Sequence, residues 1–246
     1  MAQQPARPSR RQIMVAGAAT MAAATVGGTQ VAYAAGYGYG SGDLGNWQIS
    51  SKAIASESTI KYVLARDGVF MFGDSISIQD GRALATRLAG RTGDPLAVNN
   101  WSGRPTQPTV DALAQWATLY GLPRRILMAI GSNDIFTPPV FAAQADRTMD
   151  IVGPNRTVIW VNIQVARTTR PAAVQLADQR NSAWINLQLS DAQRRHPNLR
   201  IVRWAEYLAA KPGRLTWYLR DGVHTSVPAG QDARNELIVQ GLTTAK

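Results

Sequence analysis

Five short apolar runs alternate with amphipathic stretches along this 246-residue chain, and no other feature limits its fold as strongly. Runs of this length are typical of buried strands, and they lie at residues 68–72, 95–99, 126–130, 158–163 and 199–202. Apolar residues recur at helical spacing in the intervening stretches, at residues 80–89, 109–120, 140–152, 174–195 and 229–242. Such regular alternation predicts a five-stranded parallel sheet with helices on both faces, a three-layer α/β/α architecture.

The N-terminal residues 1–34 have the pattern of a cleaved signal peptide. Residues 9–14 (SRRQIM) form a twin-arginine motif, and an apolar stretch rich in Ala, Gly and Thr follows it. Ala32 and Ala34 place small residues at both positions that define a cleavage site. A retained membrane anchor is the alternative, but residues 27–30 (GGTQ) interrupt the run before the roughly 20 apolar residues that a span needs. We expect cleavage after Ala34, export by the Tat translocase to the cell envelope or beyond, and no stable membrane span.

The remaining residues 35–246 suit one domain preceded by an extension. Residues 35–66 are expected to form a flexible, Gly-rich lead-in and N-terminal extension, and residues 67–246 the folded domain. Residues 40–45 (GSGDLG) match a dinucleotide-binding fingerprint, but no strand precedes them and no helix pattern follows. We therefore expect no dinucleotide cofactor.

Composition excludes several classes of protein. The chain has no Cys and only two His, which argues against disulfide scaffolds, thiol nucleophiles and nitrogen–sulfur metal sites. We accordingly expect neither a metal nor another cofactor. The formal net charge is +10, yet the arginines are scattered instead of clustered with aromatic residues, so no nucleic-acid partner is expected.

Polar segments follow three of the predicted strands, and another precedes the last predicted helix. These segments are residues 73–77 (GDSIS), 99–105 (NNWSGRP), 131–134 (GSND) and 221–224 (DGVH). In parallel α/β sheets, functional residues lie beyond the carboxyl ends of the strands. Together the segments supply a serine, a histidine with an acid three residues earlier, and hydrogen-bond donors. Acyl transfer by a serine nucleophile requires these groups.

In this order, the four segments resemble the sequence blocks of the SGNH (GDSL) hydrolase superfamily, over residues 67–246. The resemblance implies a flavodoxin-like fold and an enzyme that hydrolyses carboxylic esters. It also implies that Ser75 is the nucleophile, that His224 is the base and then the acid, and that Asp221 orients His224. The backbone amides of Ser75 and Gly103 and the side chain of Asn133 would form the oxyanion hole.

Each of these residues also has a plainer structural interpretation. Ser75 could serve only as the N-cap of the helix that follows it. Asn133 and Asp134 could be ordinary turn residues, and Gly103 could be required only for its backbone angles. The second histidine, His196, lies at the end of a predicted helix, where we expect a solvated side chain without a catalytic role.

The substrate is the least constrained part of the prediction. Trp101, Trp217 and Tyr218 are candidates to stack on a sugar or to contact an acyl chain, although Trp217 and Tyr218 could instead belong to the core. Arg104 is a candidate to pair with a substrate carboxylate or phosphate. We expect an exported serine esterase acting on O-acyl esters of envelope glycans, glycolipids or lipids. An acyltransferase that uses the same site to acylate a sugar hydroxyl is the main alternative, and a catalytically silent binding module is a third.

Overall fold

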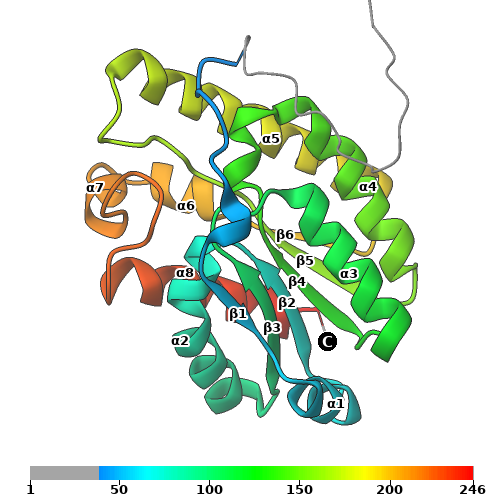
Figure 1. The fold of residues 1–246 in the computed structure, drawn as a ribbon. Helices are drawn as coiled ribbons and strands as arrows, with labels where there is room; N and C mark the ends of the chain where they lie inside the picture. The colour runs from blue at the N-terminus through cyan, green and yellow to red at the C-terminus, as the bar shows by residue number, and fades with distance from the viewer. Residues whose placement is uncertain (1–38, 246) are drawn as a thin grey trace, which may run out of the picture. The chain divides into compact units, whose positions relative to one another are not determined.

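The computed structural model describes residues 39–245, and the predicted signal peptide at residues 1–34 lies outside them. The described chain contains a six-stranded sheet with the strand order β1-β3-β2-β4-β5-β6 (Figure 1). The strands are β1 (Lys52–Ile54), β2 (Val69–Gly73), β3 (Leu96–Trp101), β4 (Arg125–Ala129), β5 (Thr157–Val161) and β6 (Leu199–Val202).

The five predicted strands correspond to β2 to β6, and all of them are parallel. Their order in the sheet, second-first-third-fourth-fifth, is the flavodoxin-like order. The sheet differs from the prediction by one additional strand, β1, which pairs antiparallel with β3 at the edge of the sheet. Because β1 has only three residues, of which Lys52 and Ile54 are exposed, it lacks the apolar run by which the other strands are predicted.

Helices cover both faces of the sheet. They are α1 (Glu57–Ala65), α2 (Ser75–Thr92), α3 (Thr106–Tyr120), α4 (Phe141–Val152), α5 (Ala172–Arg195), α6 (Trp204–Ala209), α7 (Arg214–Tyr218) and α8 (Ala229–Thr243). Side chains of α1, α3, α4 and α5 pack in one apolar core, whereas those of α2, α6 and α8 pack in another (Figure 1). The three-layer prediction is therefore confirmed.

Strand β2 shows how the sequence produces these two cores. Its side chains are fully buried on both faces, with Phe70 and Phe72 in the core beside α3 and Val69 and Met71 in the core beside α2. Alternate residues of a strand point to opposite faces, so a strand between two helix layers must be apolar throughout. Hydrophobic burial on both faces thus fixes β2 in the centre of the sheet, and its last residue, Gly73, lies two residues before Ser75.

The described part of the expected lead-in is attached to α5. The Asn181 side-chain amide donates hydrogen bonds to the Tyr39 carbonyl oxygen at 2.8 Å and to Ser41 Oγ at 3.0 Å. Ser41 is buried, and the ring of Tyr39 contacts that of Trp184. Residues 39–41 of the expected lead-in therefore contact the domain through α5.

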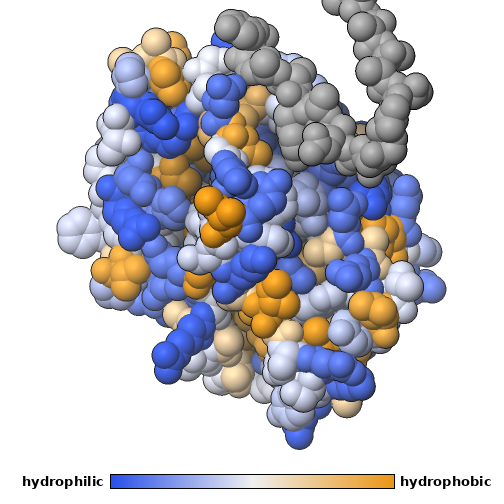
Figure 2. All heavy atoms as spheres, in the orientation of Figure 1, coloured by the Kyte–Doolittle hydropathy of each residue, from blue (hydrophilic) through white to orange (hydrophobic). Residues whose placement is uncertain are grey.

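The surface in Figure 2 carries hydrophobic side chains scattered among hydrophilic ones. Single apolar side chains on a surface are ordinary in folded proteins. Within residues 39–245, no helix combines the length and the apolar character needed to cross a membrane.

Candidate active site

A serine, a histidine and an aspartate form a continuous hydrogen-bonded chain at the carboxyl end of β2. Ser75 Oγ lies 2.9 Å from His224 Nε2, and His224 Nδ1 lies 2.8 Å from Asp221 Oδ2. With the ring proton on Nδ1, the imidazole donates to the Asp221 carboxylate and its Nε2 can accept the Ser75 proton. The structure thus brings together the three residues predicted as nucleophile, base and orienting acid.

The loop before α8 holds Asp221 and His224 in this arrangement. Asp221 Oδ1 accepts hydrogen bonds from the backbone N–H groups of Val223 and His224, at 3.0 and 2.8 Å. Partial burial alone would raise the pKa of Asp221, but these hydrogen bonds and the His224 ring lower the pKa below its ordinary value. Asp221 is therefore ionised at neutral pH and can stabilise the imidazolium that forms when His224 takes a proton.

Each residue of the Gly73-Asp74-Ser75 segment has a local structural requirement. A Cβ atom on Gly73 would lie 2.2 Å from Ser77 Oγ, so only glycine fits where β2 turns into α2. Asp74, and not Ser75, caps the helix, because its Oδ1 accepts the Ile76 N–H at 3.0 Å. Ser75 is the first residue of α2, and its side chain is free to contact His224.

A buried network links the His224 loop to α2. The Asp80 side chain on α2 is fully buried, and its Oδ1 accepts a hydrogen bond from Thr225 Oγ1 at 2.8 Å. The Gln79 side-chain amide donates to Thr225 Oγ1 at 2.6 Å and to the Thr225 carbonyl oxygen at 3.0 Å. From α8, Arg234 Nη1 lies 3.4 Å from Asp80 Oδ2. The residue after His224 is thereby fixed to the helix that begins with Ser75.

Asn133 is placed beside Ser75 by the pairing of β2 with β4. It lies in a short 3-10 helix, η2 (Ser132–Phe136), which begins three residues after the last residue of β4. The adjacent Asp134 is buried and accepts hydrogen bonds from Thr106 N and Oγ1, at 3.0 and 2.7 Å, which ties η2 to the start of α3. Burial raises the pKa of Asp134 to about 7 although the Thr106 hydrogen bonds oppose the shift.

Two of the three predicted oxyanion donors border a cavity of about 280 Å³ that also contains His224 and Asp221. These two are Ser75 and Asn133. Gly103 does not line the cavity, but it precedes Arg104, whose carbonyl oxygen accepts a hydrogen bond from Asn133 Nδ2 at 3.3 Å. Gly103 has φ of +74°, a backbone conformation that favours glycine.

The apolar wall of this cavity is not predicted from the sequence. Ile135 and Phe136 of η2, Val165 of the loop after β5, and Val223 beside His224 form the wall. The same loop also contributes residues 167, 169 and 170. The sequence does contain a signal for this loop. Residues 164–171 follow a predicted strand, so they lie at the edge of the sheet where the other functional segments lie.

The four candidate substrate residues, Trp101, Arg104, Trp217 and Tyr218, do not line this cavity. Arg104 is buried, with Nη1 donating to Asn99 Oδ1 at 2.9 Å and Nη2 donating to the Asn99 carbonyl oxygen at 2.6 Å. Burial lowers its pKa to about 10, and its hydrogen bonds hold the loop before α3 instead of meeting a ligand.

Trp101 packs edge-on against Trp47, with ring centroids 4.9 Å apart. Tyr218 packs against two aromatic rings from α6, and Trp217 is 70% exposed.

His196 lies at the C-cap of α5, where its Nε2 is 2.9 Å from Asp146 Oδ1. This position agrees with the helix-end interpretation.

Comparisons with known proteins identify the fold. No family model matches the chain, and no curated protein matches its sequence. The fold is similar to that of the catalytic domain of peptidoglycan O-acetyltransferase A from Streptococcus pneumoniae, which was solved with a methylsulfonyl adduct. The TM-score is 0.58 and the sequence identity 18%, and the match covers 73% of this chain and 94% of that chain. A lipase/acylhydrolase from Enterococcus faecalis has the same TM-score and 19% identity, over 72% of this chain and 95% of that chain. A GDSL-like lipase from Bacteroides thetaiotaomicron, at 16% identity, covers 79% of this chain and 93% of its own length, with a TM-score of 0.58.

The chain has the SGNH hydrolase fold. The flavodoxin-like SGNH architecture predicted from the sequence is therefore confirmed. In this SGNH fold, Ser75 and Asn133 follow the paired strands β2 and β4, and His224 reaches them from the loop before α8.

Proposed function

We propose that this protein is a serine esterase that is exported by the Tat route and hydrolyses O-acyl esters outside the cytoplasm. The observation that carries the proposal is the hydrogen-bonded chain Ser75–His224–Asp221, with distances of 2.9 and 2.8 Å. Ser75, His224 and Asp221 line a cavity with an apolar wall, so an ester can reach Ser75 while its acyl part contacts apolar side chains. Neither the helix cap nor the core requires a hydrogen bond between Ser75 and His224.

The geometry supports a two-step reaction through an acyl-enzyme. Ser75 Oγ attacks the ester carbonyl carbon while His224 Nε2 accepts the hydroxyl proton, and the carbonyl oxygen becomes an oxyanion. The Asn133 amide and the backbone N–H groups of Ser75 and Gly103 are the proposed donors to this oxygen. His224 then donates its proton to the departing alkoxide, which leaves as the alcohol.

Deacylation repeats these steps with water as the nucleophile. His224 accepts a proton from water as the water oxygen attacks the acyl carbon, and the bond to Ser75 Oγ breaks. The proton returns to Ser75, and the carboxylic acid is released. Asp221 remains ionised throughout and stabilises the imidazolium in both steps.

The twin-arginine motif supports a substrate in the cell envelope, because an exported esterase meets acylated glycans, glycolipids and lipids there. The cavity of about 280 Å³ and its apolar wall suit an acyl group of modest size. These features support O-acyl esters as the substrate class.

A second candidate, acyl transfer to a sugar hydroxyl, is favoured by one comparison. The O-acetyltransferase domain matches this fold as well as the lipase/acylhydrolase does, each with a TM-score of 0.58. In this alternative a sugar hydroxyl takes the place of water in the second step, and His224 accepts its proton.

One assay separates the two outcomes. The mature protein is incubated with short- and long-chain 4-nitrophenyl esters, with and without a sugar acceptor, and the products are identified by mass spectrometry. Free acid with an unmodified acceptor supports the hydrolase, whereas acylated acceptor replaces that proposal with the transferase. Turnover that persists in Ser75→Ala would contradict both.

A further inference from the structure

Two arginines line the catalytic cavity, and the first of them is neutralised within the protein. Arg167 donates hydrogen bonds from Nε and Nη2 to the two carboxylate oxygens of Asp178, at 2.8 and 2.7 Å. Asp178 is fully buried, and the Arg167 guanidinium lies over the Phe136 ring, 5.0 Å from its centroid. Arg167 therefore acts as part of the cavity wall, with its charge already paired.

The second arginine, Arg170, has an unpaired charge. Its guanidinium has no hydrogen bond or ion pair with any residue in the described range 39–245, and its side chain is exposed. Among the described residues that line the cavity, Asp221 is the one carboxylate, and His224 and two backbone N–H groups occupy its oxygens. The cavity thus presents one cation that nothing in it compensates.

The backbone that carries Arg170 is fixed to the loop that carries Asp221 and His224. Ala166 N donates to the Gly222 carbonyl oxygen at 2.9 Å, and Thr168 N donates to the Asp221 carbonyl oxygen at 3.0 Å. This approach is so close that a Cβ on Gly222 would lie 1.8 Å from the Ala166 carbonyl oxygen. The position of the Arg170 backbone relative to His224 is therefore constrained.

Arg170 has its own local hydrogen bonds, and they use only its backbone. Its N–H donates to the Arg167 carbonyl oxygen at 2.9 Å, and its carbonyl oxygen accepts from Gln175 Nε2 at 2.7 Å. The Arg170 backbone is therefore held in place, while its guanidinium remains available to bind a ligand. A guanidinium in this state can bind a carboxylate, phosphate or sulfate through paired N–H donors.

We propose that Arg170 binds an anionic group of the substrate, so that the preferred substrates are O-acyl esters that also carry a carboxylate, phosphate or sulfate near the ester. This inference rests on the proposed esterase or transferase function, and it specifies the substrate class. It also replaces Arg104, which is buried, with a different arginine as the residue that recognises an anion.

The test uses two pairs of chromogenic esters that differ in one carboxylate. The first pair is 4-nitrophenyl acetate and 5-acetoxy-2-nitrobenzoate, with the charge on the alcohol part. The second pair is 4-nitrophenyl butanoate and mono-4-nitrophenyl succinate, with the charge on the acyl part. For each enzyme, kcat/KM of the anionic ester is divided by that of its neutral partner, so differences in intrinsic reactivity cancel between variants.

We expect Arg170→Gln to lower this ratio about fivefold for at least one pair, the upper end of the range for exposed ion pairs. Arg170→Glu should lower it further, because it adds repulsion, and about 0.5 M salt should reduce the wild-type preference. The pair that responds identifies the part of the ester that carries the anion.

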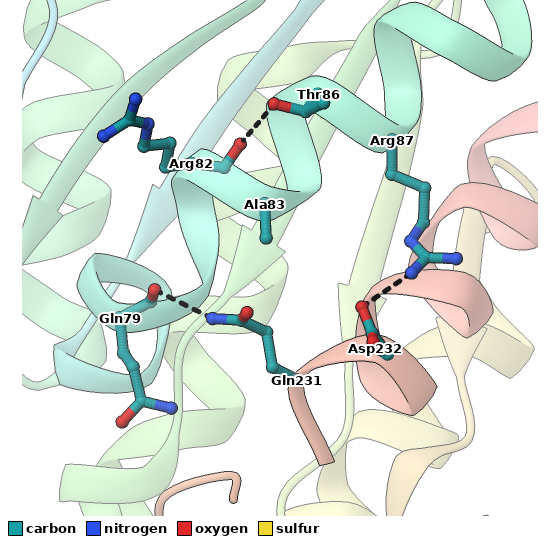
Figure 3. Close-up of a pocket in the computed structure, with 7 residues that line it drawn as sticks. All are labelled: Gln79, Arg82, Ala83, Thr86, Arg87, Gln231 and Asp232. Carbon is teal, nitrogen blue, oxygen red and sulfur yellow. Dashed lines mark hydrogen bonds and ion pairs between the residues drawn. The ribbon is translucent and has the colours of Figure 1, made fainter. Parts of the chain in front are cut away.

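The matched control is Arg82→Gln. Arg82 is an exposed arginine on α2 that does not line the catalytic cavity, and Figure 3 shows its guanidinium directed away from Gln231 and Asp232. This variant should leave both ratios unchanged. If the wild-type protein cleaves these esters and Arg170→Gln alters neither ratio, the inference is overturned while the esterase proposal stands. If the wild type cleaves none of the four esters and acylates no acceptor, the proposed function fails and the inference fails with it.

Discussion

The hydroxyl of Thr225 connects the stability of the fold to the position of the catalytic base. Thr225 is fully buried, and its Oγ1 donates to Asp80 Oδ1 at 2.8 Å while accepting from Gln79 Nε2 at 2.6 Å. Thr225→Val keeps the shape of the side chain and removes both hydrogen bonds. The buried Asp80 carboxyl then loses its shortest hydrogen bond, and Arg234 at 3.4 Å remains its charged partner.

Removing a hydrogen bond to a buried charged group costs about 1.5–3 kcal/mol. We therefore expect the free energy of unfolding of Thr225→Val to fall by about 2 kcal/mol, measured by urea unfolding followed by tryptophan fluorescence. We also expect kcat to fall about 10-fold with KM nearly unchanged, because the loop that carries His224 loses a contact to α2. A displacement of about 1 Å at a catalytic group can lower the rate about 100-fold, and a smaller shift of His224 lowers it less.

Thr118→Val is the matched control, because Thr118 lies on the exposed side of α3 and its hydroxyl bonds only to the Ala114 carbonyl oxygen. It should leave kcat unchanged. If Thr225→Val loses stability but keeps its full kcat, the network stabilises the fold without positioning His224. Unchanged stability and unchanged kcat together would refute the reasoning altogether.

Three further predictions concern other parts of the molecule. Asn133→Ala should lower kcat about 10²–10³-fold with KM and melting temperature close to wild type, because an oxyanion donor acts mainly on the transition state; a change in KM alone would contradict this role. The free energy of unfolding should fall as pH rises from about 4 to about 7, because Asp134 has a pKa of about 7 in the folded chain and an ordinary value of 3.8 when unfolded. Urea unfolding across this range should show a shallower fall for Asp134→Asn, and an equally steep fall would contradict the assignment. Replacing Arg10 and Arg11 together by lysine should retain the protein inside the cell, as fractionation and immunoblotting would show, and unaffected export would contradict Tat targeting.

Local sequence patterns predict the elements that bury many apolar residues. Strands β2 to β6 and helices α2, α3, α4, α5 and α8 are all predicted, because the strands are short apolar runs and the helices have apolar residues at helical spacing. Strand β1 and helices α1, α6 and α7 are not predicted. Strand β1 and helices α6 and α7 have only three to six residues, so too few positions repeat to form a pattern, whereas the nine-residue α1 lies within the expected N-terminal extension.

The same distinction applies to the site. The Ser75, Asn133 and Asp221–His224 segments are recognisable because each is a polar segment next to a predicted strand or helix. The burial of Arg104 is not recognisable, since it depends on hydrogen bonds to Asn99 on β3. Arg170 likewise reaches the cavity through hydrogen bonds between two loops more than 50 residues apart in the chain. Contacts between distant segments carry no signature in a single sequence.

The identity of the nucleophile is the central claim, and covalent labelling tests it most directly. An organophosphonate ester probe should add to the mature protein once, and peptide mapping by mass spectrometry should locate the adduct on Ser75. Ser75→Ala should abolish labelling and His224→Ala should slow it strongly, because His224 accepts the Ser75 proton. An adduct on any other residue, or undiminished labelling of Ser75→Ala, would contradict the account.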